Sequence, residues 1–399
     1  MIPIYFSDPA VFCAIGSNKE EFWASLISGN QSGIKKVEAL QYSFFAAKIN
    51  NSLLTEKSSS KYDSRIIRIE EKCLSQIENE IQTVIKKYSP QKIGICVGSC
   101  DNGTELSVKG HTEFFKNQKF PENYNLEMQS ADYVSTFIAE KYKITGPALS
   151  FSTACSSSAS AIIKASELLQ SEICDAVICG GVDLASNTAL IGFNSLEAIS
   201  SEITNPFSKN RHGITLGEGA AFFVLTREPL FTSENPIKLL GYGESADAYH
   251  MTSPDPEGKG AFLAMQRALK KSQKEPKDID YLNLHGTGTK FNDSMEAKAV
   301  AKLFGENSVP SSSTKSLTGH TLGASGAIEC AACYLTLKNN YKKEKISLPL
   351  QVWDGIKDEQ CPSLNIVDKN FSYNKKEVNC CMSNSFAFGG ANSSLVLGF

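Results

Sequence analysis

The chain has 399 residues, of which 41% are hydrophobic and 21% are charged, and its formal net charge is −3 at pH 7. This is the composition of a globular protein with one large core or two fused halves. A net charge so close to zero gives no general attraction to nucleic acid or to an anionic membrane. We therefore expect neither kind of partner, whereas a local basic patch for an acidic protein is compatible with this charge.

Cysteine placement and the start of the chain indicate the compartment. Most of the twelve cysteines lie in apolar runs such as 92–97 and 176–180, which predicts buried free thiols in a reducing environment. Cys330 and Cys333 have no second pair at zinc-finger spacing, so we expect them to pack in the core. The first residues lack the basic segment of a signal peptide, and no apolar run reaches the roughly 20 residues that span a bilayer. These features predict a cytoplasmic protein without a membrane span.

Short apolar runs alternate with longer helical patterns, which predicts an α/β protein. In chain order the predicted elements are a strand at 2–6, helices at 19–27 and 66–87, strands at 93–97 and 148–154, a helix at 157–170, strands at 176–179 and 220–225, a helix at 260–271, a strand at 281–284, helices at 294–303 and 324–338, and strands at 378–382 and 394–397. The polar stretches 50–65 and 101–125 are predicted to be surface loops.

Cys155 stands where an extended run ends and a helix rich in Ala, Ile and Leu begins. Small residues fill this turn, at 152–158, and leave space for a substrate. The partial positive charge at a helix N-terminus lowers the pKa of a thiol and favours the nucleophilic thiolate. Cys155 is therefore a candidate nucleophile, and a small buried thiol is the alternative interpretation.

Two of the five histidines, His285 and His320, lie in stretches rich in glycine and hydroxyl side chains. A neutral imidazole donates a hydrogen bond to a thioester carbonyl, and two such donors would stabilise the enolate left when a malonyl group loses carbon dioxide. Lys315 and Glu329 flank His320, and a buried pair of this kind would hold its loop and tune its protonation. The alternative is that both histidines only cap or pack.

A glycine-rich turn at Gly389 and Gly390 joins the last two predicted strands. Such turns are common between strands, but glycines at positive φ would allow a backbone N–H to face a thioester oxygen. Together with the N–H of Cys155, it would form an oxyanion hole. Because Cys155, His285 and this turn all follow predicted strands, we expect them to share one site.

Taken together, the order and spacing of these motifs resemble the β-ketoacyl-acyl-carrier-protein synthases of the elongating branch, within the thiolase superfamily. The resemblance runs nearly from end to end, and its segments are 22–34, 153–157, 180–183, 206–219, 285–296, 315–320 and 384–390. It implies a five-layered αβαβα thiolase fold of two similar halves. We place these halves at 1–235, with the nucleophile, and at 236–399, with the two histidines.

The resemblance also implies residue roles. Cys155 matches the acylated nucleophile, and His285 and His320 match the pair that promotes malonyl decarboxylation and stabilises the enolate. Lys315 and Glu329 match the supporting pair. The remaining matched positions are the gating aromatic Phe388, whose N–H completes the oxyanion hole, and the substrate-binding or gate residues Phe386, Gly389, Thr287 and Thr289. No metal is implied.

The implied reaction is decarboxylative Claisen condensation of a cysteine-bound acyl group with malonyl-acyl-carrier protein. Both substrates would arrive on the phosphopantetheine arm of the acyl carrier protein, and no bound cofactor is expected. The implied assembly is a homodimer whose partner lines part of the acyl pocket, with a heterodimer with a chain-length-factor-like subunit as the alternative.

Four positions depart from the usual family residues: Ser208, Gly288, Lys290 and Ala387 stand where Asp, Ser, Pro and Gly are common. None removes a catalytic group. They suggest a divergent member in a specialised pathway such as aryl polyene assembly, while fatty-acid elongation stays open.

Three other classes fit less well. A thiolase acting on coenzyme A thioesters needs a second cysteine as base near the C-terminus, and Cys380 and Cys381 lie within a predicted strand instead. An initiating synthase would carry Asn at the position of His320. A chain-length-factor-like subunit, which is not an enzyme, typically lacks the nucleophile that Cys155 provides.

Overall fold

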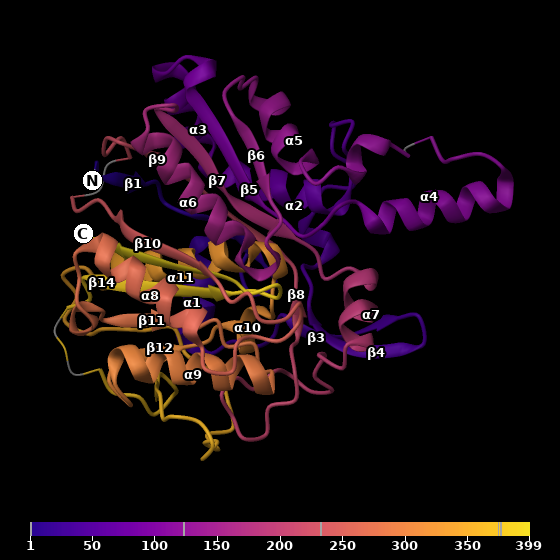
Figure 1. The fold of residues 1–399 in the computed structure, drawn as a ribbon. Coiled ribbons are helices and arrows are strands. Elements are labelled where there is room, and N and C mark those ends of the chain that lie inside the picture. Colours follow the sequence, from indigo (N-terminus) through magenta and orange to yellow (C-terminus); the bar gives the residue numbers. More distant parts are fainter. Residues whose placement is uncertain (1, 123, 232–233, 374, 376) are drawn as a thin grey trace.

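Helices cover both faces of a large twisted sheet in this α/β fold (Figure 1). The computed structural model describes residues 2–122, 124–231, 234–373, 375 and 377–399. The strands are β1 (Ile4–Phe6), β2 (Ala10–Cys13), β3 (Ile34–Ala39), β4 (Tyr42–Ala47), β5 (Ile93–Gly98), β6 (Ala148–Phe151), β7 (Ala176–Asp183), β8 (Leu216–Gly217), β9 (Gly219–Thr226), β10 (Lys238–Ala246), β11 (Tyr281–Asn283), β12 (Pro310–Ser312), β13 (Asn365–Ile366), β14 (Cys380–Phe386) and β15 (Ala391–Gly398). The α-helices are α1 (Lys19–Ser28), α2 (Arg65–Leu74), α3 (Glu78–Lys87), α4 (Thr104–Asn117), α5 (Tyr133–Tyr142), α6 (Ser157–Gln170), α7 (Asn187–Ser195), α8 (Lys259–Ser272), α9 (Lys290–Phe304), α10 (Lys315–Thr318) and α11 (Ser325–Asn340).

The two halves of the chain repeat one strand arrangement. In the first half, β9 is antiparallel to β7, and β7, β5 and β6 are parallel neighbours. In the second half, β15 is antiparallel to β14, and β14, β11 and β12 are parallel neighbours. Strand β1 pairs with both β9 and β10, and so joins the two sets into one sheet. The two similar halves that the sequence predicts are therefore present, whereas a boundary at residue 235 stays a prediction.

The fold has five layers of helices and sheet, because each half of the sheet has an apolar face on both sides that helices cover. Helices α6 and α11 pack against each other between the two halves of the sheet, and their Ala and Ile side chains form the central core. The backbone N–H of Ala327 donates to Oγ of Ser158 at 2.8 Å across this contact. Helices α2, α3 and α5 cover the outer face of the first half, and α8 and α9 cover that of the second (Figure 1). This confirms the predicted αβαβα order.

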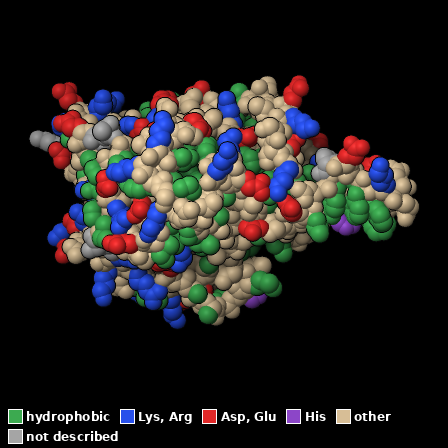
Figure 2. All heavy atoms as spheres, turned by 90° about the horizontal axis from the view of Figure 1, so that it is seen from above, with side chains coloured by type: hydrophobic (Ala, Val, Ile, Leu, Met, Phe, Trp, Pro, Cys, Tyr) green, Lys and Arg blue, Asp and Glu red, His purple; other side chains and the backbone are tan. Residues whose placement is uncertain are grey.

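Most predicted elements are present within a few residues, and two predictions were wrong. The helix predicted at 66–87 is broken between α2 and α3 by a 3₁₀ turn at Ser75–Ile77. The stretch 101–125, predicted to be a loop, contains helix α4, which projects from the body with hydrophobic side chains gathered on it (Figures 1 and 2). Its aromatic side chains stack outside the main core, with the rings of Phe114 and Phe120 4.6 Å apart.

The cysteines match their prediction. All twelve are free thiols, and ten are buried. Cys330 and Cys333 are fully buried on α11 and belong to the central core, as expected for packing residues. Of the helices that the structure describes, none is both long enough and apolar enough to cross a membrane. A cytoplasmic location stays a prediction.

Candidate active site

Cys155 sits in a strained turn between β6 and α6. Ala154 has a φ of 49°, unusual for a residue with a side chain, and it begins the 3₁₀ turn Ala154–Ser156 that leads into α6. The Oγ of Ser157 braces this turn, because it accepts from the N–H of Thr153 at 2.9 Å and donates to the carbonyl of Ala154 at 2.6 Å. The small side chains that the sequence places here allow strand and helix to approach closely. The sequence therefore predicts this strand-to-helix turn correctly.

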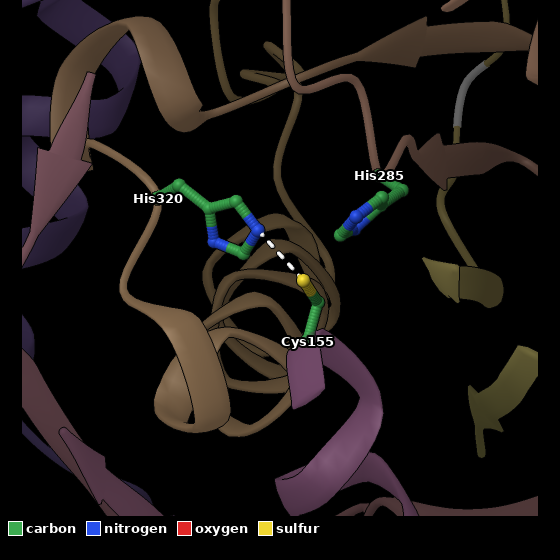
Figure 3. Close-up of side chains that lie close together, drawn as sticks. All are labelled: Cys155, His285 and His320. Atoms are coloured by element: carbon green, nitrogen blue, oxygen red, sulfur yellow. Dashed lines mark hydrogen bonds between the residues drawn. The ribbon is translucent and has the colours of Figure 1, made fainter. Parts of the chain in front are cut away.

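His320 lies at the equivalent turn of the second half, between α10 and the 3₁₀ turn Leu322–Ala324 that leads into α11. Its backbone N–H donates to the carbonyl of Thr215 at 2.7 Å, and its carbonyl accepts from Gly217 at 2.9 Å. The N–H of Leu322 donates to Nδ1 of the imidazole at 3.1 Å, so Nδ1 is the unprotonated nitrogen. Nε2 therefore carries the proton, and it lies 3.0 Å from Sγ of Cys155 (Figure 3).

His285 follows β11 and faces the same sulfur (Figure 3). Its backbone N–H donates to Oε1 of Glu296 at 2.8 Å, which fixes the start of its loop. The ammonium of Lys315 lies 3.3 Å from Nδ1 of His285. Since an ammonium group only donates, Nδ1 accepts and Nε2 carries the proton here too. The rings of His285 and His320 are 5.4 Å apart and nearly perpendicular, so two N–H donors converge on one point beside Cys155.

Both imidazoles are neutral. Burial, and then the positive charge of Lys315, hold the pKa of His285 and of His320 well below the ordinary value. The thiol of Cys155 departs from the expectation of a lowered pKa, because burial raises its pKa to about 11. The charge of Lys315 and the N–H groups of Phe388 and Cys155 lower it, but they do not outweigh the loss of water. The resting pair is therefore a thiol and a neutral imidazole.

Lys315 and Glu329 form a buried ion pair, 0% and 2% exposed. The ammonium of Lys315 also donates to the carbonyl of His285. Burial raises the pKa of Glu329, and Lys315 opposes that rise. Although the pair flanks His320 in the sequence, its direct contacts are with His285. Its hydrogen bonds thus support His285 and not the loop of His320, whereas the charge of Lys315 lowers the pKa of His320 and so tunes its protonation as predicted.

A cavity of about 470 Å³ opens at the two histidines, and four of the five predicted gate and binding residues lie on its wall, all but Gly389. The members of that wall that the sequence predicts are His285, His320, Thr287, Thr289, Phe386 and Phe388. The ring of Phe388 packs on Phe193, with centroids 5.8 Å apart. The backbone N–H groups of Phe388 and Cys155 lower the pKa of the thiol, so both lie near the sulfur. Their action as an oxyanion hole stays a prediction.

Gly389 allows the chain to turn, but its backbone N–H does not donate a hydrogen bond into the cavity. It has a φ of 85°, as predicted for this turn, and Gly390 has one of 76°. The N–H of Gly389, however, donates to the carbonyl of Met251 at 2.8 Å. The turn is thereby tied to the segment at 247–255, and among its backbone groups it is the N–H of Phe388 that lowers the thiol pKa of Cys155.

Sequence reasoning gave no role to two carboxylates, Asp293 and Glu296, that shape the His285 loop. Asp293 accepts from the N–H groups of Phe207 and Thr287, at 2.8 and 3.0 Å. Glu296 accepts from His285 and also from Gly286, at 2.7 Å. The sequence contained a signal for this role, because the two acidic residues stand one turn apart on the buried face of α9, directly after the Gly-rich loop.

Cys155, His285 and His320 also have the residue types of a metal site, since one ligand atom of each lies within 4.8 Å of the others. Their protonation argues for hydrogen-bond donors instead. Each Nε2 carries a proton, because the Nδ1 of each ring already accepts a hydrogen bond. A metal would have to displace both protons beside the ammonium of Lys315. The geometry therefore favours hydrogen-bond donation by the two imidazoles over metal binding by the trio.

Comparison with known proteins identifies the family. The chain matches the family model "Beta-ketoacyl synthase, N-terminal domain" over residues 10–229 and "Beta-ketoacyl synthase, C-terminal domain" over residues 237–348. A 3-oxoacyl-[acyl-carrier-protein] synthase 2 of Coxiella burnetii is 30% identical over 97% of this chain and 96% of its own. One of Staphylococcus aureus is 30% identical over 96% of this chain and 97% of its own.

Solved structures agree with this assignment. A chain in the complex of the ketosynthase ApeO with its chain length factor ApeC, from Xenorhabdus doucetiae, has a TM-score of 0.89 and 37% identity, and the match covers 99% of this chain and 98% of that one. A β-ketoacyl synthase from Burkholderia phymatum has a TM-score of 0.83 and 25% identity, over 100% and 99% of the two chains. On the family models, the relatives and the shared thiolase fold, this chain belongs to the β-ketoacyl synthase family.

Proposed function

We propose that the protein is a β-ketoacyl-acyl-carrier-protein synthase, which loads an acyl group onto Cys155 and extends it with malonyl-acyl-carrier protein. The observation that carries this proposal is the convergence of two imidazole Nε2–H donors, both on the wall of one cavity, beside the thiol of Cys155. Family membership supports the same reaction. The substrates are thioesters on the phosphopantetheine arm of an acyl carrier protein, and Thr287 and Thr289 on the cavity wall contact that arm.

In the first half-reaction the sulfur of Cys155 attacks the carbonyl of the acyl thioester. The carbonyl oxygen becomes an oxyanion, and the N–H groups of Phe388 and Cys155 donate to it. Collapse breaks the bond to the carrier sulfur and leaves the acyl group on Cys155. The thiol proton ends on the departing carrier thiolate. Because Nδ1 of His320 accepts from Leu322 and its Nε2 is protonated, His320 serves as a donor and not as the base for this proton.

In the second half-reaction the malonyl thioester binds in the same cavity and loses carbon dioxide. The electron pair of the broken C–C bond moves into an enolate, whose oxygen accepts from Nε2–H of His285 and of His320. The enolate carbon then attacks the acyl carbonyl on Cys155, and the C–S bond breaks. The products are carbon dioxide, a β-ketoacyl-carrier protein two carbons longer, and the Cys155 thiolate, which takes a proton from water.

We further propose that the chain works in a dimer, either with a second copy or with a chain-length-factor-like subunit. Solved relatives favour the second arrangement, because both ApeO and the ishigamide ketosynthase are described with a chain length factor. The departures at Ser208, Gly288, Lys290 and Ala387 favour a specialised pathway of the aryl polyene type over fatty-acid elongation.

Reconstitution tests the reaction. The protein is incubated with an acyl-carrier protein and malonyl-carrier protein, and the extended β-ketoacyl product and carbon dioxide are measured. His320→Ala should lower the rate by about 10²-fold to 10³-fold, since it removes one of two enolate donors. His111→Ala, a histidine on the projecting helix α4, is the matched control and should leave turnover unchanged. Unchanged turnover in His320→Ala would refute the role of this residue.

A further inference from the structure

A buried carboxylate, Asp183, lies between the segments that carry Cys155 and His320. It ends β7 and is 2% exposed. Oδ2 accepts from the N–H groups of Cys100 and Gly323, each at 2.8 Å, and Oδ1 accepts from Leu184 at 3.0 Å. These described partners are all backbone N–H groups, and burial raises the pKa of Asp183 to about 7. A carboxyl buried without a cation is costly, so a specific role is expected for it.

On one side, Asp183 holds the turn that orients His320. Leu322 has a φ of 51°, and its N–H points at Nδ1 of His320. The next N–H, of Gly323, points the other way, at Oδ2 of Asp183. A side chain at Gly323 would place its Cβ 2.8 Å from that oxygen, so only glycine allows the approach. The two diverging N–H groups share one short turn, so anchoring Gly323 also fixes the direction of the Leu322 donor.

On the other side, Asp183 holds the segment beside the nucleophile. Cys100 follows β5, and its Sγ lies 3.4 Å from the carbonyl of Ala154, which directly precedes Cys155. The N–H of Cys100 donates to the same Oδ2 that receives Gly323. One oxygen atom thus ties together the two segments whose side chains meet at the 3.0 Å contact between Cys155 and His320.

We propose that Asp183 is a positioning residue, which holds the turn at 321–323 against the nucleophile segment and so fixes the tautomer and direction of His320. Its carboxylate oxygens are occupied by the backbone N–H groups of Cys100, Gly323 and Leu184, so it acts on the reaction through His320. The inference rests on the proposed function of His320 as an enolate donor. It predicts that the acceptor geometry of residue 183 matters more than its charge.

The test compares Asp183→Ala with Asp183→Asn. The amide oxygen of Asn still accepts from Cys100 and Gly323, whereas Ala cannot. We expect Asp183→Ala to lower kcat by about 10²-fold, as for loss of one enolate donor, with KM for the carrier protein unchanged. Asp183→Asn should stay within about threefold of the wild type. Nitrogen-15 spectra of histidine-labelled protein, assigned by difference from His320→Ala, should show a protonated Nε2 in the wild type and in Asp183→Asn, and a loss of that single tautomer in Asp183→Ala.

Unchanged kcat in Asp183→Ala, or unchanged His320 resonances in a variant with lowered kcat, would overturn the proposal. So would an equal loss in Asp183→Asn. If Asp183→Ala does not fold, Gly323→Ala replaces it and should give the same loss. Asp280→Ala is the control, because Asp280 also accepts two backbone N–H groups, from Asn379 and Cys380, but at the start of β14. If the wild type forms no β-ketoacyl product, the proposed function fails, while the His320 resonances still test Asp183.

Discussion

Replacing Lys315 with Met should destabilise the fold and abolish catalysis for two separable reasons. Without Lys315, Glu329 keeps only Ser325 as a partner, at 3.2 Å, and one of its carboxylate oxygens already has no partner among the described residues. Removing one member of a buried ion pair costs about 3–5 kcal/mol. The double variant Lys315→Met, Glu329→Gln removes the stranded charge and should recover most of this loss. Its catalytic rate should stay low, because Nδ1 of His285 has lost the donor that fixes its tautomer.

The dependence on pH follows from Glu329. Its pKa in the folded protein is raised by burial, and loss of Lys315 raises it further. A carboxyl with a raised folded pKa contributes stability that is lost as pH rises, so Lys315→Met should be more destabilised at about pH 8 than at about pH 5.5. Urea unfolding followed by circular dichroism measures this. Lys141→Met, at a more exposed pair with Glu71, is the control and should change little. Equal destabilisation at both pH values, or no recovery in the double variant, would refute the reasoning.

Two further predictions use other buried groups. The rate of Cys155 alkylation by iodoacetamide should rise with pH without a plateau up to about pH 9, because burial raises the thiol pKa to about 11; a plateau near neutrality would contradict this. Glu70 is fully buried on α2, and neither of its carboxylate oxygens has a partner in the described part of the chain. Glu70→Met should therefore raise the free energy of unfolding by about 1–3 kcal/mol. The gain in the free energy of unfolding should grow with pH, since burial raises the pKa of Glu70. A lower unfolding midpoint for Glu70→Met at neutral pH would contradict this prediction, because it would show that the fold needs the carboxyl group.

The local sequence was sufficient to predict the structure of a segment where residues within that segment determine its conformation. The turn at Cys155 is such a case, because an apolar run, small residues and a helix-forming stretch follow one another. Helix α4 was missed because its support comes from outside the helix. Tyr124 packs against Gly110, where a Cβ would lie 2.2 Å from its ring, and Phe120 stacks on Tyr124 at 4.4 Å. Contacts of this kind decide between helix and loop and leave no periodic pattern in the polar stretch 101–125.

The sequence also predicted which residues belong to the candidate site, but it did not predict the burial and the contacts of each side chain. The helix N-terminus at Cys155 suggests a lowered thiol pKa, whereas distant segments bury the sulfur and raise it. Lys315 lies next to His320 in sequence, yet the loop after β11 brings His285 to its ammonium. Asp183 ends a buried strand, and the family resemblance of segment 180–183 gives this residue no role. Its role depends on Cys100 and Gly323, which only the fold brings together.

The position of the acyl group is the most direct test of the central claim. The protein is mixed with an acyl-carrier protein in the absence of malonyl groups, and intact mass and peptide mapping locate the adduct. We predict one acyl group on the peptide that contains Cys155, its loss in Cys155→Ala, and its disappearance, with formation of the β-ketoacyl product, when malonyl-carrier protein is added. An adduct on another residue such as Cys100, or condensation by Cys155→Ala, would contradict the account.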